Sequence, residues 1–169
     1  MFNKVLGAVA AAALTVAPVN ARVENGTKPL IDLIDNSGIS VFINHTDCAS
    51  GEYLGLYRHR GMQRAFILCP GETIDADDHM VVRHEAIHAI QHCVNVARGT
   101  HVMTPIINDD AKLMAFVRNY LTEEYIQRIQ EIYDPTHWRI EFEAFAGMKA
   151  YTSDQLAEMF RTACLYTDA

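Results

Sequence analysis

The chain has 169 residues, of which 14 are Lys or Arg and 21 are Asp or Glu, so its formal net charge is −7. This length suits one compact domain with a core of its own. An acidic surface repels phosphate backbones, and because no basic cluster offsets it, we expect no nucleic-acid partner.

Residues 1–21 have the layout of a secretory signal peptide. A short start carries Lys4, an apolar run follows, and small residues precede a cleavage site near Ala21. The run is short for a membrane anchor, so a cleaved signal peptide is favoured over the alternative, an uncleaved N-terminal anchor, and no later run approaches the length that spans a bilayer. We therefore expect a secreted or periplasmic protein, with a single domain over residues 22–169 and no stable membrane span after signal removal.

The segment 28–38 has apolar residues at mixed spacing and predicts either a short helix or an entering strand. Three β-branched or aromatic runs follow, at residues 39–44, 52–59 and 64–69. Turn residues separate these runs. The pattern predicts a small antiparallel sheet of three strands over residues 39–69.

The next segment predicts a long helix that ends near Ala97. It contains no Gly or Pro, and Gly99 is a good stop signal. Three carboxylates suit its first turn, where free N–H groups meet them: Asp75, Asp77 and Asp78. Apolar residues lie nearly all round this helix, which indicates a central, buried position.

The rest of the chain is predicted to be helical. Four segments carry the helical period: residues 109–121, 122–133, 136–151 and 153–166. Ser153 is the expected N-cap of the last segment. Strands, a buried helix and a helical half, in that order, predict an α+β fold.

Four cysteines follow the signal segment: Cys48, Cys69, Cys93 and Cys164. An even number in an oxidising compartment predicts two disulfides, and the alternative is four free buried thiols. We favour Cys48–Cys69, which would join two neighbouring strands, and Cys93–Cys164 then follows by elimination. No CxxC pair occurs, which argues against a zinc site made of cysteines alone.

The stretch RHEAIHAIQHC, residues 83–93, places three histidines and a glutamate on the long helix. His84 and His88 are four apart, so both imidazoles can bind one metal ion. Glu85 lies beside that face and can act as general base on a metal-bound water. His92 rises about 12 Å from His84, too far to share the ion, so we place it near the site or partly exposed. The alternative is a helix that merely carries histidines.

A catalytic zinc site needs three protein ligands and one position open to water. The segment 138–150 offers Glu141 and Glu143 within an apolar, Ala-rich helix, where a buried carboxylate needs a partner or a metal. Two residues apart on a helix is about 200°, so only one of the two can face the metal. The residues alone leave both glutamates open.

His84-Glu85-x-x-His88 followed by EFEAFA, residues 141–146, resembles the gluzincin metallopeptidases, especially the E-x-E-A segment of membrane-linked and small soluble members. The resemblance implies a zincin-like fold with a three- or four-stranded sheet before the HExxH helix. It also implies Zn²⁺ as cofactor and a peptide or protein substrate. The third ligand would be the first glutamate of the segment, Glu141.

The chain departs from the family pattern at Phe145, where an acidic residue often follows the alanine. Support for a histidine ligand must then come from elsewhere. The candidates are Asp109, Asp110 and Asp154. Glu143 is expected near the site, or paired with a base such as Arg139.

The predicted function is that of a secreted zinc-dependent peptidase. Glu85 would take a proton from the metal-activated water and return it to the leaving amine. A further donor should stabilise the oxyanion, and His137, Tyr151 and Tyr57 are candidates by position and chemistry. The alternatives are a non-catalytic zinc-binding module of the same fold and a disulfide-stapled secreted interaction domain. A purely structural site has no need of the Glu85 carboxylate.

Overall fold

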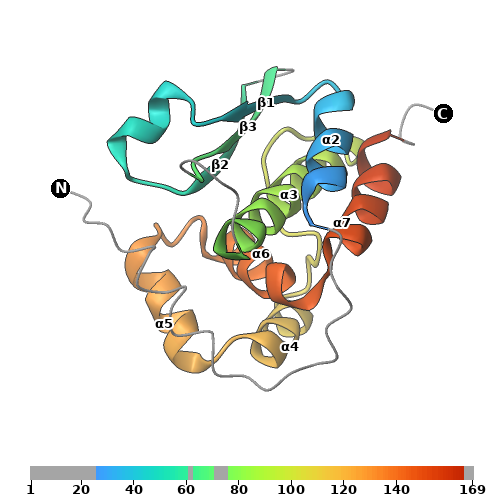
Figure 1. Ribbon diagram of the computed structural model, residues 1–169. Coiled ribbons are helices and arrows are strands. Elements are labelled where there is room, and N and C mark those ends of the chain that lie inside the picture. Colours follow the sequence, from blue (N-terminus) through green and yellow to red (C-terminus); the bar gives the residue numbers. More distant parts are fainter. Residues whose placement is uncertain (1–25, 61–62, 71–75, 166–169) are drawn as a thin grey trace. The chain divides into compact units, whose positions relative to one another are not determined.

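The computed structural model describes residues 26–60, 63–70 and 76–165, and Figure 1 shows their helices and strands. Contacts along the chain divide it into two compact units, one up to Val82 and one from Arg83. The predicted signal peptide lies outside the described residues. So do Asp75 and the side chains of Asp77 and Asp78, which were expected in the first turn of the long helix.

The first unit begins with helix α2 (Lys28–Asn36), the helical one of the two conformations left open for this segment. Pro29 lies in its first turn, where the missing N–H is tolerated. Leu30 and Ile34 are one turn apart and both are buried, so this helix packs one apolar face inward.

The sheet has three strands, β1 (Ser40–Ile43), β2 (Gly55–Arg60) and β3 (Gln63–Leu68), in the order β1-β3-β2. Strands β2 and β3 form an antiparallel hairpin, but β1 runs parallel to β3. The predicted all-antiparallel sheet is therefore wrong in this one pairing, although the number of strands is confirmed.

The burial of β3 explains why it takes the central position. Phe66, Ile67 and Leu68 are consecutive and all buried, so both faces of the strand end are covered. A strand buried on both faces reads as a continuous apolar run and belongs inside a sheet. The chain reverses direction between β1 and β2 and again between β2 and β3, so β1 and β3 run in the same direction.

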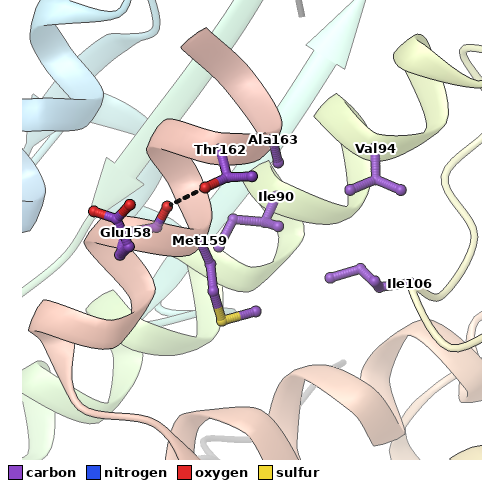
Figure 2. A pocket seen from close by; sticks show the side chains of 7 residues that line it. All are labelled: Ile90, Val94, Ile106, Glu158, Met159, Thr162 and Ala163. Carbon is purple, nitrogen blue, oxygen red and sulfur yellow. Dashed lines mark hydrogen bonds between the residues drawn. The ribbon is translucent and has the colours of Figure 1, made fainter. Parts of the chain in front are cut away.

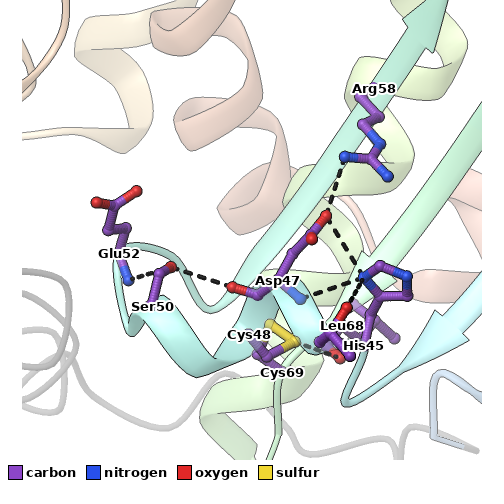
Figure 3. The surroundings of a disulfide bond; sticks show 9 residues. His45, Asp47, Cys48, Ser50, Glu52, Arg58, Leu68 and Cys69 are labelled. Carbon is purple, nitrogen blue, oxygen red and sulfur yellow. Dashed lines mark hydrogen bonds and ion pairs between the residues drawn. A yellow bond between two sulfur atoms is a disulfide. The ribbon is translucent and has the colours of Figure 1, made fainter.

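A disulfide between Cys48 and Cys69 fastens this sheet, as predicted, with Cα atoms 5.6 Å apart. Figure 3 shows that Cys48 comes from the 3₁₀ helix η1 (Thr46–Ser50) and that Cys69 follows β3 directly. The bond therefore joins a helical turn to a strand end, and not two strands. Asp47 ties the same turn to β2 by an ion pair with Arg58, 2.9 Å from Oδ2 to Nη1.

The helical half begins in α3 (Ala76–Ala97), which ends before Gly99 at φ 81° as predicted. Four further helices follow: α4 (Asp110–Tyr120), α5 (Glu123–Ile132), α6 (Trp138–Ala150) and α7 (Ser153–Phe160). The predicted α+β fold, with a sheet followed by a mostly helical C-terminal half, is confirmed. No helix in the described ranges is both long and apolar enough to cross a membrane.

The N-cap of α7 is Thr152, and the predicted cap, Ser153, is already the first helical residue. The Thr152 hydroxyl accepts a hydrogen bond from the Gln155 backbone N–H, and the Gln155 side chain accepts one from Thr152 N–H. This reciprocal capping box satisfies two free donors at once. Ser153 as N-cap could not form such a box, because the residue three positions later is Leu156.

Helix α6 is the core element of the second unit, with every residue from Ile140 to Met148 buried. It packs closely on α3, because a Cβ atom built on Gly147 would lie 2.6 Å from Cδ1 of Ile87. The second disulfide, Cys93–Cys164, is also as predicted and ties α3 to the π-helical turn η2 (Arg161–Leu165) that continues α7.

Candidate metal centre

The breaker-free helix α3 presents His84 and His88 on one face, one turn apart. Both side chains are buried, at 7% and 5% exposure. Their Nε2 atoms point at each other across 3.0 Å. Two imidazoles therefore converge on one point inside the protein.

Glu141 reaches the same point from α6. Its Oε2 lies 3.3 Å from Nε2 of His84, and its Oε1 lies 3.5 Å from Nε2 of His88. Within the described residues, these three side chains form a buried group that could hold a metal ion. The two elements that carry them are held together by the close approach at Gly147.

The spacing of the three ligand atoms suits a small tetrahedral cation. Bonds of about 2.0–2.1 Å at tetrahedral angles put ligand atoms roughly 3.3 Å apart. The Nε2–Nε2 distance of 3.0 Å and the two nitrogen–oxygen distances bracket that value. In the described part of the chain, the buried Glu141 Oε2 also accepts no hydrogen bond, so it has capacity for an ion.

Strong electrostatic coupling joins His88 and Glu141. Burial alone would lower the pKa of His88, but the charge of Glu141 and a hydrogen bond to it outweigh burial and raise this pKa to about 9. Burial alone would raise the pKa of Glu141, but the charge of His88 and the close approach of both imidazoles hold it well below its usual range. Without a metal, a proton on His88 therefore compensates the buried carboxylate.

Glu85 is buried beside this group, at 6% exposure. Its charge acts on two neighbours, because it contributes to the raised pKa of His88 and to that of Tyr133. A carboxylate that is close to a metal ligand, but outside the ligand group, has the position required of a general base.

Glu143 has different surroundings from Glu141. Its carboxylate accepts hydrogen bonds from Gln91 Nε2 at 2.9 Å and from the backbone N–H groups of Ile106 and Ile107 at 2.7 and 2.8 Å. Of the two surroundings expected for Glu143, the pairing with Arg139 is not formed, because that guanidinium binds Asp110 at 2.6 Å, and the alternative, a place near the site, remains. Glu143 is thus occupied by donors on the protein itself.

Support for His88 comes from Gln91, which the sequence reasoning missed. The Nδ1 atom of His88 lies 2.8 Å from Oε1 of Gln91. Of the three predicted carboxylates, Asp109 caps α4 through Lys112 N–H, Asp110 binds Arg139, and Asp154 is exposed. The available signal was a polar residue three positions after His88 in an otherwise apolar helix.

An aromatic cluster adjoins His84, centred on Phe145. The centroid of the Phe145 ring lies 4.4 Å from that of His84. The ring centroids of Tyr125 and Tyr133 lie 5.7 and 6.0 Å from that of Phe145. Burial raises the pKa of Tyr133 first, and the charges of Glu141 and Glu85 raise it further. Phe145, which departs from the family pattern, thus provides an apolar wall at the site.

The predicted oxyanion donors occupy other places. Tyr151 stacks on Phe116 with ring centroids 6.0 Å apart, His137 is exposed at the start of α6, and Tyr57 is buried on β2. Of the two places expected for His92, partial exposure is excluded because the side chain is only 2% exposed, and among the described residues His92 does not belong to the ligand group.

An apolar cavity of about 270 Å³ borders a different part of the second unit (Figure 2). Ile90 and Val94 of α3 face it together with Met159 of α7, as Figure 2 shows. It shares no lining residue with the group formed by the two histidines and Glu141. This cavity is therefore not the metal centre.

No family model, curated protein or solved structure matches this chain. The case for a metal centre accordingly depends on the residues and their geometry. These define an α+β protein with a buried group of two histidines and one glutamate that could bind a metal ion.

Proposed function

We propose that the protein is a secreted zinc-dependent peptidase of the gluzincin type with a zincin-like fold. His84, His88 and Glu141 would hold the zinc ion, and Glu85 would act as general base. The observation that carries the proposal is the convergence of three buried ligand atoms at spacings of 3.0–3.5 Å on the HExxH helix and α6. Two imidazoles and a carboxylate are a ligand set that zinc enzymes use.

When bound, zinc lowers the pKa of a coordinated water and polarises the scissile carbonyl. Glu85 would hold the proton taken from the attacking water and pass it to the leaving amine. Its buried position and its closeness to His88 suit that role, because a carboxylate near a histidine ligand can reach the water without entering the ligand group.

Two features favour a catalytic role for this zinc site over a structural one. Structural zinc sites have four protein ligands, whereas the group in the described residues has three. A structural site also has no use for a buried carboxylate at position 85, where burying an ionised group is costly.

The test is metal analysis of the mature protein together with a cleavage assay on a broad peptide library. We expect one zinc per chain and cleavage that stops on chelation and returns with zinc. Glu85→Gln should keep the zinc but lower cleavage by about 10²–10⁴-fold, the usual contribution of a general base. Glu124→Gln, the same chemical change at an exposed position, is the matched control.

The zinc content and the cleavage activity together distinguish the zinc peptidase from the two alternative functions. Absence of stoichiometric zinc would contradict the metal site and favour a disulfide-stapled interaction domain. Zinc without cleavage of any peptide would favour a non-catalytic zinc-binding module. Full activity in Glu85→Gln would remove the general base from the proposal.

A further inference from the structure

The side chain of Gln91 lies at the centre of a buried hydrogen-bond network next to the metal ligands. It is 0% exposed. Its Nε2 atom donates to the backbone oxygen of Ile140 at 3.1 Å and to Oε2 of Glu143 at 2.9 Å. Its Oε1 atom faces Nδ1 of His88 at 2.8 Å.

The orientation of this amide follows from its partners. Amide oxygen and nitrogen are assigned from the hydrogen bonds they make, and a carbonyl and a carboxylate can only accept. The NH₂ group must therefore face Ile140 and Glu143, which leaves the amide oxygen toward His88. An oxygen at 2.8 Å requires a donor, so Nδ1 of His88 carries a proton.

The proton on Nδ1 determines what the other ring nitrogen can do. In a neutral imidazole one nitrogen is a donor and the other an acceptor, so Nε2 of His88 has the free lone pair. Nε2 is the atom that faces His84 and Glu141. Gln91 thus selects the tautomer that offers a lone pair to a metal ion.

Glu143 keeps Gln91 from turning over. Its carboxylate oxygens are 2.9 Å from the Gln91 amide and 2.7 and 2.8 Å from two successive backbone N–H groups of the Ile106–Ile107 segment. A rotated Gln91 amide would bring its oxygen against the Glu143 carboxylate and the Ile140 carbonyl, and that buried amide oxygen would have no donor. The segment before α4 is therefore connected to His88 through two side chains.

We infer that Gln91 is a positioning residue for the metal ligand His88, that Glu143 holds Gln91 in place, and that this network makes the zinc site bind its ion tightly. The inference rests on the proposed zinc site. It does not require that the site be catalytic, and it gives Glu143 a role that is different from that of a ligand.

The two histidine ligands differ in whether their Nδ1 atom has a hydrogen-bond partner. In the described part of the chain, Nδ1 of His84 has no hydrogen-bond partner, and its ring instead packs on Phe145 at 4.4 Å. Only His88 has a hydrogen bond that selects its tautomer. Loss of the network should therefore act through His88 alone.

Three variants of the full mature protein test the inference. Gln91→Leu keeps similar volume but removes the acceptor for His88. Glu143→Gln keeps the acceptor for His88 but places an NH₂ group among three N–H donors, so it should loosen the hold on the Gln91 side chain. Asn95→Leu is the control for loss of a buried amide on α3, since the Asn95 side chain bonds to Thr104 and to the backbone oxygen of Gln91 but not to the Gln91 side chain or to His88.

Zinc affinity is measured by competition with a chromophoric chelator, and the geometry of the site by the visible absorption of the Co²⁺-substituted protein. Loss of a group that orients a histidine ligand typically costs 10–100-fold in metal affinity. We expect Gln91→Leu to lose about that much and to alter the Co²⁺ spectrum. Glu143→Gln should lose less affinity than Gln91→Leu, because the acceptor for His88 is still present, and Asn95→Leu should keep both the affinity and the spectrum.

A proton NMR spectrum of the zinc-loaded protein gives an independent reading. The Nδ1 proton of His88 should exchange slowly in the wild type and rapidly in Gln91→Leu. If zinc binds wild type and Gln91→Leu equally, or if Asn95→Leu loses as much, the role of Gln91 is overturned while the zinc site stands. If wild type binds no zinc, the proposed function fails first, and the role of Gln91 fails with it.

Discussion

Glu141 and Glu143 lie two residues apart on α6 and have opposite surroundings. Glu141 meets two imidazoles, whereas Glu143 meets three N–H donors from the protein itself. The 200° turn between them was readable from the sequence, but which one reaches His84 and His88 was not, because both lie in the same apolar segment. The resemblance to E-x-E-A segments favoured Glu141, and that residue is the one brought to His84 and His88.

The first prediction compares the two glutamates. Glu141→Ala should abolish tight zinc binding while the fold is kept, because it removes a ligand whose carboxylate is otherwise costly to bury. Glu143→Ala should keep the ligand set but destabilise the protein by a few kcal/mol, since it leaves buried N–H groups without an acceptor. Zinc content and urea unfolding of both variants measure this. Loss of zinc in Glu143→Ala with full retention in Glu141→Ala would reverse the assignment.

The second prediction concerns pH. In the metal-free protein the pKa of His88 is raised to about 9, so its stabilising effect is complete below its ordinary value of 6.5 and is lost as pH rises toward 9. The lowered pKa of Glu141 stabilises the protein above the ordinary glutamate pKa, and this is lost as pH falls. The melting temperature of the metal-free protein, measured with a chelator present, should therefore decrease as the pH is raised from 6.5 to 9.

Zinc should reverse this trend. It competes with the proton on His88, so stabilisation by zinc should grow with pH over the same range. Melting curves at fixed zinc and at fixed chelator, recorded between pH 6 and 9, measure both effects. A metal-free melting temperature that does not change across this range would contradict the coupling of His88 to Glu141.

At the level of elements, helices were more predictable than the sheet. Periodicity, acidic starts and Gly99 located α3 to α7, and Thr122 and Asp109 cap their helices through side-chain oxygens. The strand pattern of 39–69 predicted three strands but not their order, because alternation does not say which strand is central. The continuous apolar run 66–68 was the feature that distinguished the central strand, because such a run is typical of a strand buried on both faces.

The network around Gln91 was the part of the site that the sequence could not supply. Gln91 comes from α3, Ile140 and Glu143 come from α6, and the Ile106 and Ile107 N–H groups come from a connecting segment. Backbone donors carry no signature in a sequence. The ligand histidines, by contrast, are local to one helix and follow from a spacing of four.

The third prediction tests the packing of α6 on α3. A Cβ on Gly147 would meet Cδ1 of Ile87, so Gly147→Ala should cost about 1–3 kcal/mol by overpacking, less the gain in helix propensity. Ile87→Val removes the atom in conflict, so the double variant should be more stable than the sum of the two single changes. Urea unfolding of the four proteins gives the coupling. Strict additivity would contradict close packing at this point.

At the level of the whole molecule, the two disulfides close loops of different length, with sequence separations of 21 and 71 residues. The chain-entropy relation assigns about 3 kcal/mol to the shorter loop and about 4 kcal/mol to the longer one. The longer loop contains α4, α5 and α6, and therefore Glu141 but neither histidine ligand. The pairing was predictable only by elimination, after one pair had been chosen.

The fourth prediction follows from that loop. Replacing Cys93 and Cys164 by Ser should destabilise the protein by up to about 4 kcal/mol and lower zinc affinity, because the loop that carries α6 is then no longer closed covalently on α3. Replacing Cys48 and Cys69 should destabilise it by a similar amount while zinc affinity in the still-folded protein is unchanged. Chelator competition on both pairs of variants distinguishes them. Equal loss of zinc affinity in both pairs would contradict the prediction.

The third ligand lies far along the chain from the first two. A nascent chain holds His84 and His88 as soon as α3 forms, but Glu141 arrives only when α6 has docked. Under the proposed function, an incompletely folded copy has two ligands and no working centre. Hydrolysis would then begin only in finished molecules, which protects neighbouring chains during their own maturation from a partly assembled peptidase.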